Sequence, residues 1–436
     1  MIFWLGMAEV VYRLPACMER NNSIAVALLM VLILLPLTAM AEEEMNSIAE
    51  LKEFGSIEEQ ALGISQAELR PVGDQLLLVG DDGYVHLIDA AKPDDRSKDV
   101  SLTSNKDVDL QALSWHPGGQ TALIVGDDGM VLRLVMDNHA IETVDGRGVL
   151  EGERQKAIDW NRNGETAYLG GENGSIHSYS SANGFDELNI ADSPITAIEC
   201  HPHPETRVCV VTTAGDGAAV IDSYDQVHWI SNTDGDTWVD VVCPSVSLNS
   251  CVLIGSGKRI AVLYIDVEEP ASSAIDNPEV LSTLEGELTG GSLMGDGRVS
   301  LHVAPYALAA YDMEGKIAWA VVTAADVEDH GSLRGSVMVH VWGTEDDKGF
   351  ILSSSGALAK MTPIMEVEEE EDLMGYAVIT LVVISVPGLA LGMLYMNSKT
   401  LQRWWYNVTK GRKIRKQEKA QMKAEKVAAE GKSSKD

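Results

Sequence analysis

The stretch from Ala112 to Val135, "ALSWHPGGQTALIVGDDGMVLRLV", decides the fold because it nearly repeats 45 residues later. Residues 157–180 read "AIDWNRNGETAYLGGENGSIHSYS", with Trp160 in the place of Trp115. Each copy has an alternating strand, a turn with Pro, Asn or Gly, an apolar strand, a Gly-rich turn and a third strand. A supersecondary unit that recurs at a nearly fixed period predicts a closed or stacked array.

A glycine in the second turn of each unit marks the repeat along the chain. The first five of these glycines are separated by 46, 45, 43 and 40 residues. Asp, Asn and Gly suit a two-residue hairpin turn because they adopt positive φ at the least cost. The later stretches "YALAAYDMEGKIAWAV" and "GFILSSSGALAKMT" are expected to continue the series. The seven marker glycines are then Gly83, Gly129, Gly174, Gly217, Gly257, Gly315 and Gly356.

Units of about 40 to 45 residues with four short strands predict the blades of a β-propeller. We therefore predict an all-β, seven-bladed propeller over residues 42–365. The N-terminal segment "SIAELKEF" is expected to supply the last strand of the last blade and so close the ring. Six or eight blades remain alternatives, because residues 262–301 are difficult to register against the other units.

The unit resembles a WD40-type repeat, in which a strand, a Pro and Gly turn, a second strand and an Asp-Gly turn follow in this order. The resemblance extends from about Ala67 to Pro363 and implies membership of the wider class of WD40, YVTN and BNR-like propellers. The stretch "SNTDGDTW", residues 231–238, is similar to the Asp-box of sialidase-type propellers, with one residue fewer. An Asp-box is a turn that braces a blade, so this likeness implies the fold and no chemistry.

The chain begins with a segment that is typical of a secretory signal peptide. Residues 1–41 contain the apolar run 24–37, which is short for a membrane span, and end in Ala39-Met40-Ala41, an A-x-A cleavage pattern. We predict a signal peptide over residues 1–41. An uncleaved N-terminal anchor is the alternative.

A second hydrophobic run predicts one transmembrane helix near the C-terminus. Leu373 to Met396 is 24 residues long and carries no charge, and about 20 apolar residues suffice to span a bilayer. An acidic linker (366–372) precedes it, and a tail (397–436) with 12 basic and 4 acidic residues follows it. Because Lys and Arg are retained on the cytoplasmic side, we expect a cytoplasmic tail and an extracytoplasmic propeller in the cell membrane. The tail is expected to be helical only when it contacts anionic lipid headgroups, and a solvated tail is equally compatible.

The part of the chain between the entry segment and the tail is strongly acidic. The whole sequence has 33 basic and 66 acidic residues, and this part retains 19 and 60 of them, a net charge of −41. Such a surface repels nucleic acid and anionic membranes. It is expected to provide solubility in salt-rich surroundings, or to attract cations and basic partners.

Four cysteines and one sequon are candidate modification sites. Cys200 and Cys209 flank one predicted hairpin turn, and Cys243 and Cys251 flank another. Four cysteines allow three pairings, and the spacing favours the two local ones. Reduced, buried thiols are the alternative. Asn173 in "NGS" is a glycosylation candidate in a turn that is expected to be exposed.

The search for other chemistry yields turns and no catalytic, cofactor-binding or metal-binding residues. Residues 232, 234 and 236 alternate like calcium ligands, but the loop lacks the glycine and the final glutamate that such a site needs. His201 and His203 have no zinc-spaced partners and are interpreted as exposed turn residues, and His116 occupies the same repeat position as His201. No G-x-S-x-G, H-E-x-x-H, P-loop or dinucleotide motif is present.

These observations favour a membrane-anchored, extracytoplasmic propeller that acts as a non-enzymatic scaffold. Its loops are expected to bind other envelope or membrane proteins. Two alternatives remain open: an extracytoplasmic carbohydrate-active enzyme, sialidase- or lyase-like, with a site assembled from several blades, and a single-pass ligand receptor.

Overall fold

The computed structural model describes residues 47–203, 205–244, 247, 249–327, 330–345, 348–364 and 396–430. The chain divides into two compact units, Met1–Ile364 and Met365–Asp436. The predicted signal peptide (1–41), the acidic linker (366–372) and all but the last residue of the predicted transmembrane segment (373–396) lie outside the described residues. No helix in the described parts of the chain is both long enough and apolar enough to cross a membrane.

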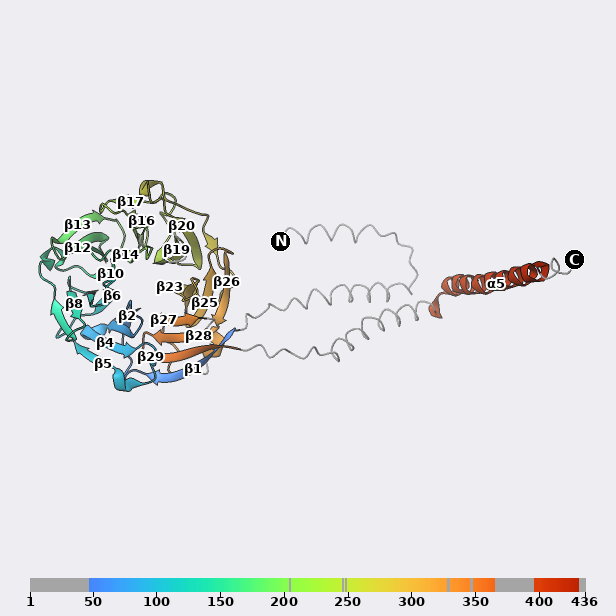
Figure 1. The fold of residues 1–436 in the computed structure, drawn as a ribbon, viewed down its shortest axis with the longest axis horizontal. Helices are drawn as coiled ribbons and strands as arrows, with labels where there is room; N and C mark the ends of the chain where they lie inside the picture. The colour runs from blue at the N-terminus through green and yellow to red at the C-terminus, as the bar shows by residue number, and fades with distance from the viewer. Residues whose placement is uncertain are drawn as a thin grey trace, which may run out of the picture. The chain divides into compact units, whose positions relative to one another are not determined.

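The first unit is a β-propeller whose described residues form seven antiparallel sheets around a ring (Figure 1). Blade 1 consists of β2 (Ile64–Leu69), β3 (Gln75–Gly80), β4 (Tyr84–Asp89) and β5 (Val100–Thr103), and blade 2 of β6 (Leu110–Trp115), β7 (Thr121–Gly126), β8 (Val131–Val135) and β9 (Ala140–Thr143). Blade 3 consists of β10 (Gln155–Trp160), β11 (Ala167–Gly171), β12 (Ser175–Ser180) and β13 (Gly184–Ile190), and blade 4 of β14 (Ile195–Cys200), β15 (Cys209–Thr213), β16 (Ala218–Ile221) and β17 (Val227–Trp229).

The remaining three blades complete the ring, which settles the blade count at seven. Blade 5 consists of β18 (Trp238–Val242), β19 (Ser250–Gly255), β20 (Arg259–Tyr264), β21 (Ala274–Ile275) and β22 (Glu279–Val280). Blade 6 consists of β23 (Glu287–Leu293), β24 (Val299–Ala304), β25 (Ala307–Asp312) and β26 (Ile317–Val322). Blade 7 consists of β27 (Met338–Glu345), β28 (Lys348–Ser353), β29 (Ala357–Pro363) and β1 (Ala49–Ser56). The connecting loops contain η1 (Asp81–Gly83), η2 (Arg96–Lys98), η3 (Arg147–Leu150), η4 (Pro270–Ser272) and α3 (Ala324–Val327).

The N-terminal strand closes the ring, as the segment "SIAELKEF" predicts. β1 pairs antiparallel with β29, with Ala49 opposite Pro363, and so becomes the outermost strand of blade 7. The backbone N–H of Ile364 donates to the carbonyl of Ile48 at 2.8 Å. The chain therefore enters and leaves the propeller at the same point.

The alternation of the strands gives the two faces of the ring. The bottom face carries the turns from the first to the second strand and from the third to the fourth strand of each blade, together with the point where both chain ends leave. The top face carries the turns from the second to the third strand and the loops that lead to the next blade. In six blades, the first residue of the top turn donates its N–H to the carbonyl just before the first strand. These bonds, 2.8 to 3.0 Å long, join Asp81 to Gly63, Asp127 to Asp109, Glu172 to Arg154, Ala214 to Pro194, Ser256 to Thr237 and Ser354 to Val337.

Blade 6 departs from this pattern, and the marker glycine assigned to it was wrong. Gly315 lies between β25 and β26, in the turn from the third to the fourth strand. The corresponding top turn of blade 6 joins β24 to β25 through Pro305, which follows a cis peptide bond. Proline has no N–H to donate, so this turn lacks both the glycine and the repeated backbone bond.

The core lies between neighbouring sheets, which explains the continuous apolar runs of the second strands. In β3, Leu76 packs in the cluster that blade 1 shares with blade 7, and Leu77 packs in the cluster shared with blade 2. Both side chains are completely buried. A strand that is covered on both faces needs apolar residues at successive positions.

In the described part of the second unit, residues 396–430, the chain forms the long helix α5 (Lys399–Glu430). Its Lys, Arg, Gln, Glu and Ala residues are strong helix formers, which accounts for the helix. Trp404, Trp405 and Tyr406 are exposed near its start. Contact between this basic helix and anionic lipid stays a prediction.

Candidate functional site

The first strands of the seven blades surround a central cavity of about 1360 Å³. Figure 1 shows these strands nearest the centre of the ring, where one edge of each has no neighbouring strand. The unpaired backbone groups on such an edge need other hydrogen-bond partners. Side chains of the preceding blade provide several of them.

Four carboxylates link successive blades around the cavity. Each accepts a hydrogen bond from a backbone N–H of the next blade's first strand or of the residue directly after it. The bonds run from Trp115 to Glu68 at 3.2 Å, from Cys200 to Asp159 at 2.6 Å, from Cys243 to Glu199 at 2.9 Å and from Gly291 to Asp240 at 2.8 Å. Blade 2 has Ser114 at the corresponding position, and its hydroxyl donates to Asp159 at 2.6 Å. We call Glu68, Asp159, Glu199 and Asp240 the carboxylate ring.

Loss of hydration governs the protonation of the carboxylate ring. Burial raises the pKa of Asp159 and of Asp240 to about 6. Burial also raises the pKa of Glu68 and of Glu199, and the nearby charge of Asp159 adds to both shifts. Hydrogen bonds from backbone N–H groups oppose this rise because they stabilise the charged form. The carboxylate ring thus links the inner strands, and burial of its charged forms is unfavourable.

Replacing Asp240 by asparagine should make the stability of the propeller less sensitive to pH. A carboxyl whose pKa is raised in the folded state contributes most to the stability of that state below its unfolded pKa, near 4. This contribution to stability is lost as the pH rises through about 6. Asparagine keeps an oxygen for the Gly291 N–H and cannot ionise. Between pH 4.5 and pH 7.5, the free energy of unfolding of Asp240→Asn should therefore rise by about 1–3 kcal/mol relative to that of the wild type.

Urea unfolding of both full-length proteins at the two pH values measures this difference. The other buried titratable groups are common to both proteins and largely cancel. An equal pH dependence of the two proteins would contradict a raised pKa for Asp240.

Two histidines complete the cavity wall in blades 6 and 7. His302 is 3% exposed, and its Nε2 lies 3.0 Å from the Ser292 hydroxyl. The His340 ring stacks on Trp342 with 6.2 Å between ring centroids. Burial lowers the pKa of His302 to about 3 and that of His340 to about 4, so both imidazoles are neutral at pH 7.

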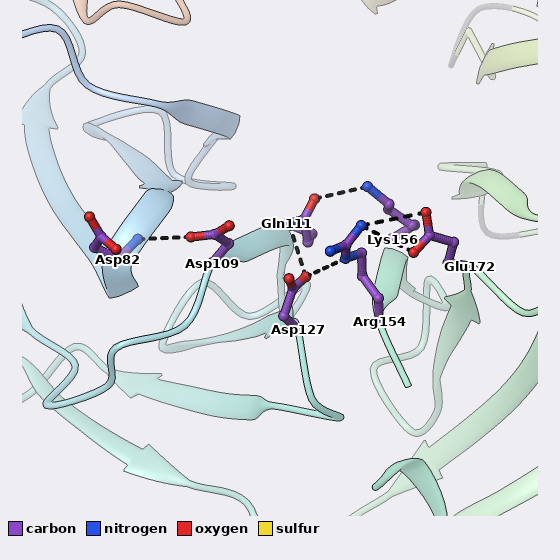
Figure 2. A network of polar contacts seen from close by, with 7 residues as sticks. All are labelled: Asp82, Asp109, Gln111, Asp127, Arg154, Lys156 and Glu172. Carbon is purple, nitrogen blue, oxygen red and sulfur yellow. Dashed lines mark hydrogen bonds and ion pairs between the residues drawn. The ribbon is translucent and has the colours of Figure 1, made fainter. Parts of the chain in front are cut away.

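A polar network ties the top loops of blades 1 to 3 together (Figure 2). Arg154 makes ion pairs with Asp127 at 2.8 Å and with Glu172 at 3.1 Å. The amide of Gln111 donates to Asp127 and accepts from the Lys156 ammonium, both at 3.1 Å. The backbone N–H of Asp82 donates to Asp109 at 3.1 Å. The basic residues Arg154 and Lys156 are thus engaged within the network.

The two exposed aspartates at the tips of the neighbouring top turns remain available to a partner. Asp82 and Asp128 adopt positive φ values of 52° and 56° in turns that end in Gly83 and Gly129. Their carboxylates have no hydrogen-bond or ion-pair partner within the ranges that the structure describes. They therefore give the top face free negative charge.

The candidate cysteines and sequon lie on both faces. The structure contains the disulfides Cys200–Cys209 and Cys243–Cys251, which is the local pairing that the spacing favours. Asn173 is exposed in the top turn of blade 3, and its side-chain oxygen accepts from the Ser175 N–H at 3.1 Å. Glycosylation of Asn173 stays a prediction.

The histidine turns and the Asp-box-like stretch have structural roles. His116 and His201 each accept, through Nδ1, the N–H of the residue two positions later, so the shared turn role is correct. The expected exposure of His201 is wrong: it is 1% exposed and lies beside the backbone of Ser247 and Ser250 in the corresponding turn of blade 5. In residues 231–238, Trp238 is fully buried and its indole N–H donates to the Thr233 carbonyl at 3.0 Å. No group of three His, Cys, Asp or Glu side chains in the described ranges is placed to hold a metal ion.

The carboxylate ring was not found by sequence reasoning, although a signal was present. Glu68, Ser114, Asp159 and Glu199 each stand one residue before the end of the first strand. Asp159 directly precedes Trp160, which the repeat alignment used as a marker. A polar residue that recurs at one position of a mostly buried strand indicates a shared partner.

Comparison with known proteins supports the fold and leaves the function open. No protein-family model matches the sequence, and no curated protein matches it. Among solved structures, the chain is similar to the WD40 β-propeller domain of Doa1, with a TM-score of 0.53 and 10% sequence identity over 72% of this chain and 98% of that domain. The structural match supports the seven-bladed propeller architecture, with a WD40 propeller as a structural neighbour. At this identity the likeness is one of fold alone.

Proposed function

We propose that the protein is a membrane-anchored, extracytoplasmic propeller that binds other envelope or membrane proteins as a non-enzymatic scaffold. The observation that carries the proposal is the common exit of both chain ends at the bottom edge of blade 7. A tether at this edge leaves the opposite, top face free to bind a partner.

The local rigidity of the top face supports a docking role. Six of the seven top turns are fixed by the same backbone hydrogen bond, and blades 1 to 3 share the network of Figure 2. Loops that are already ordered lose little entropy on binding. The free carboxylates of Asp82 and Asp128 favour a basic partner surface through charge complementarity.

The two disulfides support the extracytoplasmic location. Disulfides persist in oxidising compartments and are rare in reducing ones. The predicted signal peptide and the basic residues after the predicted transmembrane segment are consistent with the same orientation.

Crosslinking on intact cells tests location and partner binding together. A tagged full-length protein is treated with a membrane-impermeant crosslinker and purified, and the attached proteins are identified. We expect a reproducible set of membrane or envelope proteins. Asp82→Asn together with Asp128→Asn should reduce their yield several-fold, because charged contacts mainly set encounter and orientation.

A matched control pair lies on the bottom face of the same two blades. Asp94 and Asp137 are exposed and likewise lack partners in the described part of the chain. Asp94→Asn together with Asp137→Asn removes the same charge and should leave the yield unchanged. Equal losses with both pairs would exclude the top face as the docking surface. The absence of any crosslinked protein would overturn the scaffold proposal.

A further inference from the structure

The wall of the central cavity is recessed between blades 5 and 6. Gly290 lies on β23 and lines the cavity next to Asp240 and His302. A methyl group on Gly290 would lie 3.0 Å from Oδ2 of Asp240 and 3.8 Å from Nδ1 of His302. These two polar atoms therefore border the same small space, which the missing side chain leaves open.

His302 is buried but keeps one ring nitrogen without a protein partner. Its Nε2 contacts the Ser292 hydroxyl, whereas Nδ1 has no hydrogen-bond partner among the residues that the structure describes. A neutral imidazole whose Nε2–H donates to Ser292 presents Nδ1 as an acceptor. Because Nδ1 borders the open space next to Gly290, a donor bound in that space can reach it.

The remainder of the cavity wall favours a positive charge. Glu68 and Glu199 each use one carboxylate oxygen for the backbone bond to the next blade. The other oxygen of each has no partner within the described ranges. The basic side chains that line the cavity are Lys156, which donates to Gln111, and Arg162. In their ionised forms the four carboxyl groups give this enclosed space a negative potential, and a bound cation would favour those forms.

We propose that the central cavity binds the alkylammonium group of an organic amine in the recess formed by Asp240, Gly290 and His302. An ammonium group has three donors and no acceptor, which matches the carboxylate oxygen of Asp240 and the free nitrogen of His302. Hydrogen bonds between an ammonium and a carboxylate are among the strong ones. The cavity is large enough to hold the alkyl chain. This site is inferred independently of the proposed scaffold function.

Two sources can present this group: a free aliphatic amine and a lysine side chain of a partner. The probes are 1,4-diaminobutane, for the free amine, and Nα-acetyl-lysine methylamide, for the side chain. The neutral isostere 1,4-butanediol is the control for the alkyl chain. Titration calorimetry of the detergent-purified full-length protein should give saturable binding of at least one ammonium probe and none of the diol.

Two variants address the recess by different means. Asp240→Asn removes the charge, and Gly290→Ala fills the space while every carboxylate is retained. Each should weaken binding about 10–100-fold, because a hydrogen bond to a charged group is lost or blocked. Gly148→Ala, at a glycine with nothing within 4 Å of the added methyl group, is the matched control and should bind as the wild type does.

The acidic outer surface is the main competing explanation for binding. Asp94→Asn together with Asp137→Asn removes surface charge far from the recess and should not change the affinity. The melting temperature of each variant without probe confirms that it is folded. Binding that survives both Asp240→Asn and Gly290→Ala would overturn the proposal, and so would the absence of saturable binding of either ammonium probe.

Discussion

Replacing Gly129 by alanine is expected to destabilise the propeller by about 3–4 kcal/mol, which is near the upper end for a single substitution. Gly129 has a φ of +60°, where an L side chain costs about 1–2 kcal/mol. The added methyl group would also lie 2.0 Å from the carbonyl oxygen of Leu150 and 2.5 Å from its carbonyl carbon. These are backbone atoms of the loop to blade 3, and they cannot rotate away as a side chain can.

A neighbouring glycine separates the two contributions. Gly152 has a φ of +78° but nothing within 4 Å of the added methyl group. Gly152→Ala should therefore cost only about 1 kcal/mol, the backbone part alone. Urea unfolding of the two full-length variants measures the difference. Equal losses would show that close approach to Leu150 contributes nothing at Gly129.

The recurrence of this glycine was predictable because backbone geometry imposes it. Gly83, Gly174 and Gly217 share positive φ with Gly129, and a methyl group on each would meet atoms of the following loop at 2.2 to 2.3 Å. The same steric requirement acts in blades 1 to 4, so the glycine recurs in each of them, and in blades 5 and 7 Gly257 and Gly356 also have positive φ. This is why the period of the repeat could be read from the sequence, whereas the strand that closes the ring was predicted from the separate segment "SIAELKEF".

The register of blade 6 could not be predicted by the same rule. There the top turn uses Pro305, and a glycine at position 315 lies in a different turn of the same blade. Two turns with similar composition are indistinguishable when only the glycine spacing is considered. Pairing between strands, which sequence spacing does not encode, decides which turn is which.

Most of the central cavity could not be predicted from the sequence, for a different reason. The carboxylates of Glu68 and Glu199 act on backbone N–H groups of the next blade, and backbone donors leave no trace in the sequence. The recess at Gly290 depends on how blades 5 and 6 meet. His201 illustrates the same limit, because its burial depends on Ser247 and Ser250 of the next blade.

Replacing Trp238 by alanine is expected to cost about 3–5 kcal/mol. Trp238 begins β18 and is completely buried in the cluster between blades 4 and 5, against Val210, Val220 and Leu253. Truncation removes its ring from this cluster and leaves a cavity. It also leaves the Thr233 carbonyl without the indole N–H that it accepts at 3.0 Å. Urea unfolding of the full-length variant measures the loss.

Two further variants divide this cost between packing and the hydrogen bond. Trp238→Phe keeps most of the apolar area but loses the indole N–H, and should cost about 2 kcal/mol. Trp229→Ala, on the outermost strand of blade 4 where the side chain is 36% exposed, should cost about 1 kcal/mol.

Thr233 also accepts the Ala218 N–H at its hydroxyl and donates to the Ile230 carbonyl. The Asp-box-like stretch thus fastens the top turn of blade 4 to the first strand of blade 5. If Trp238→Ala cost no more than Trp229→Ala, this stretch would be an ordinary loop and not a brace between the two blades.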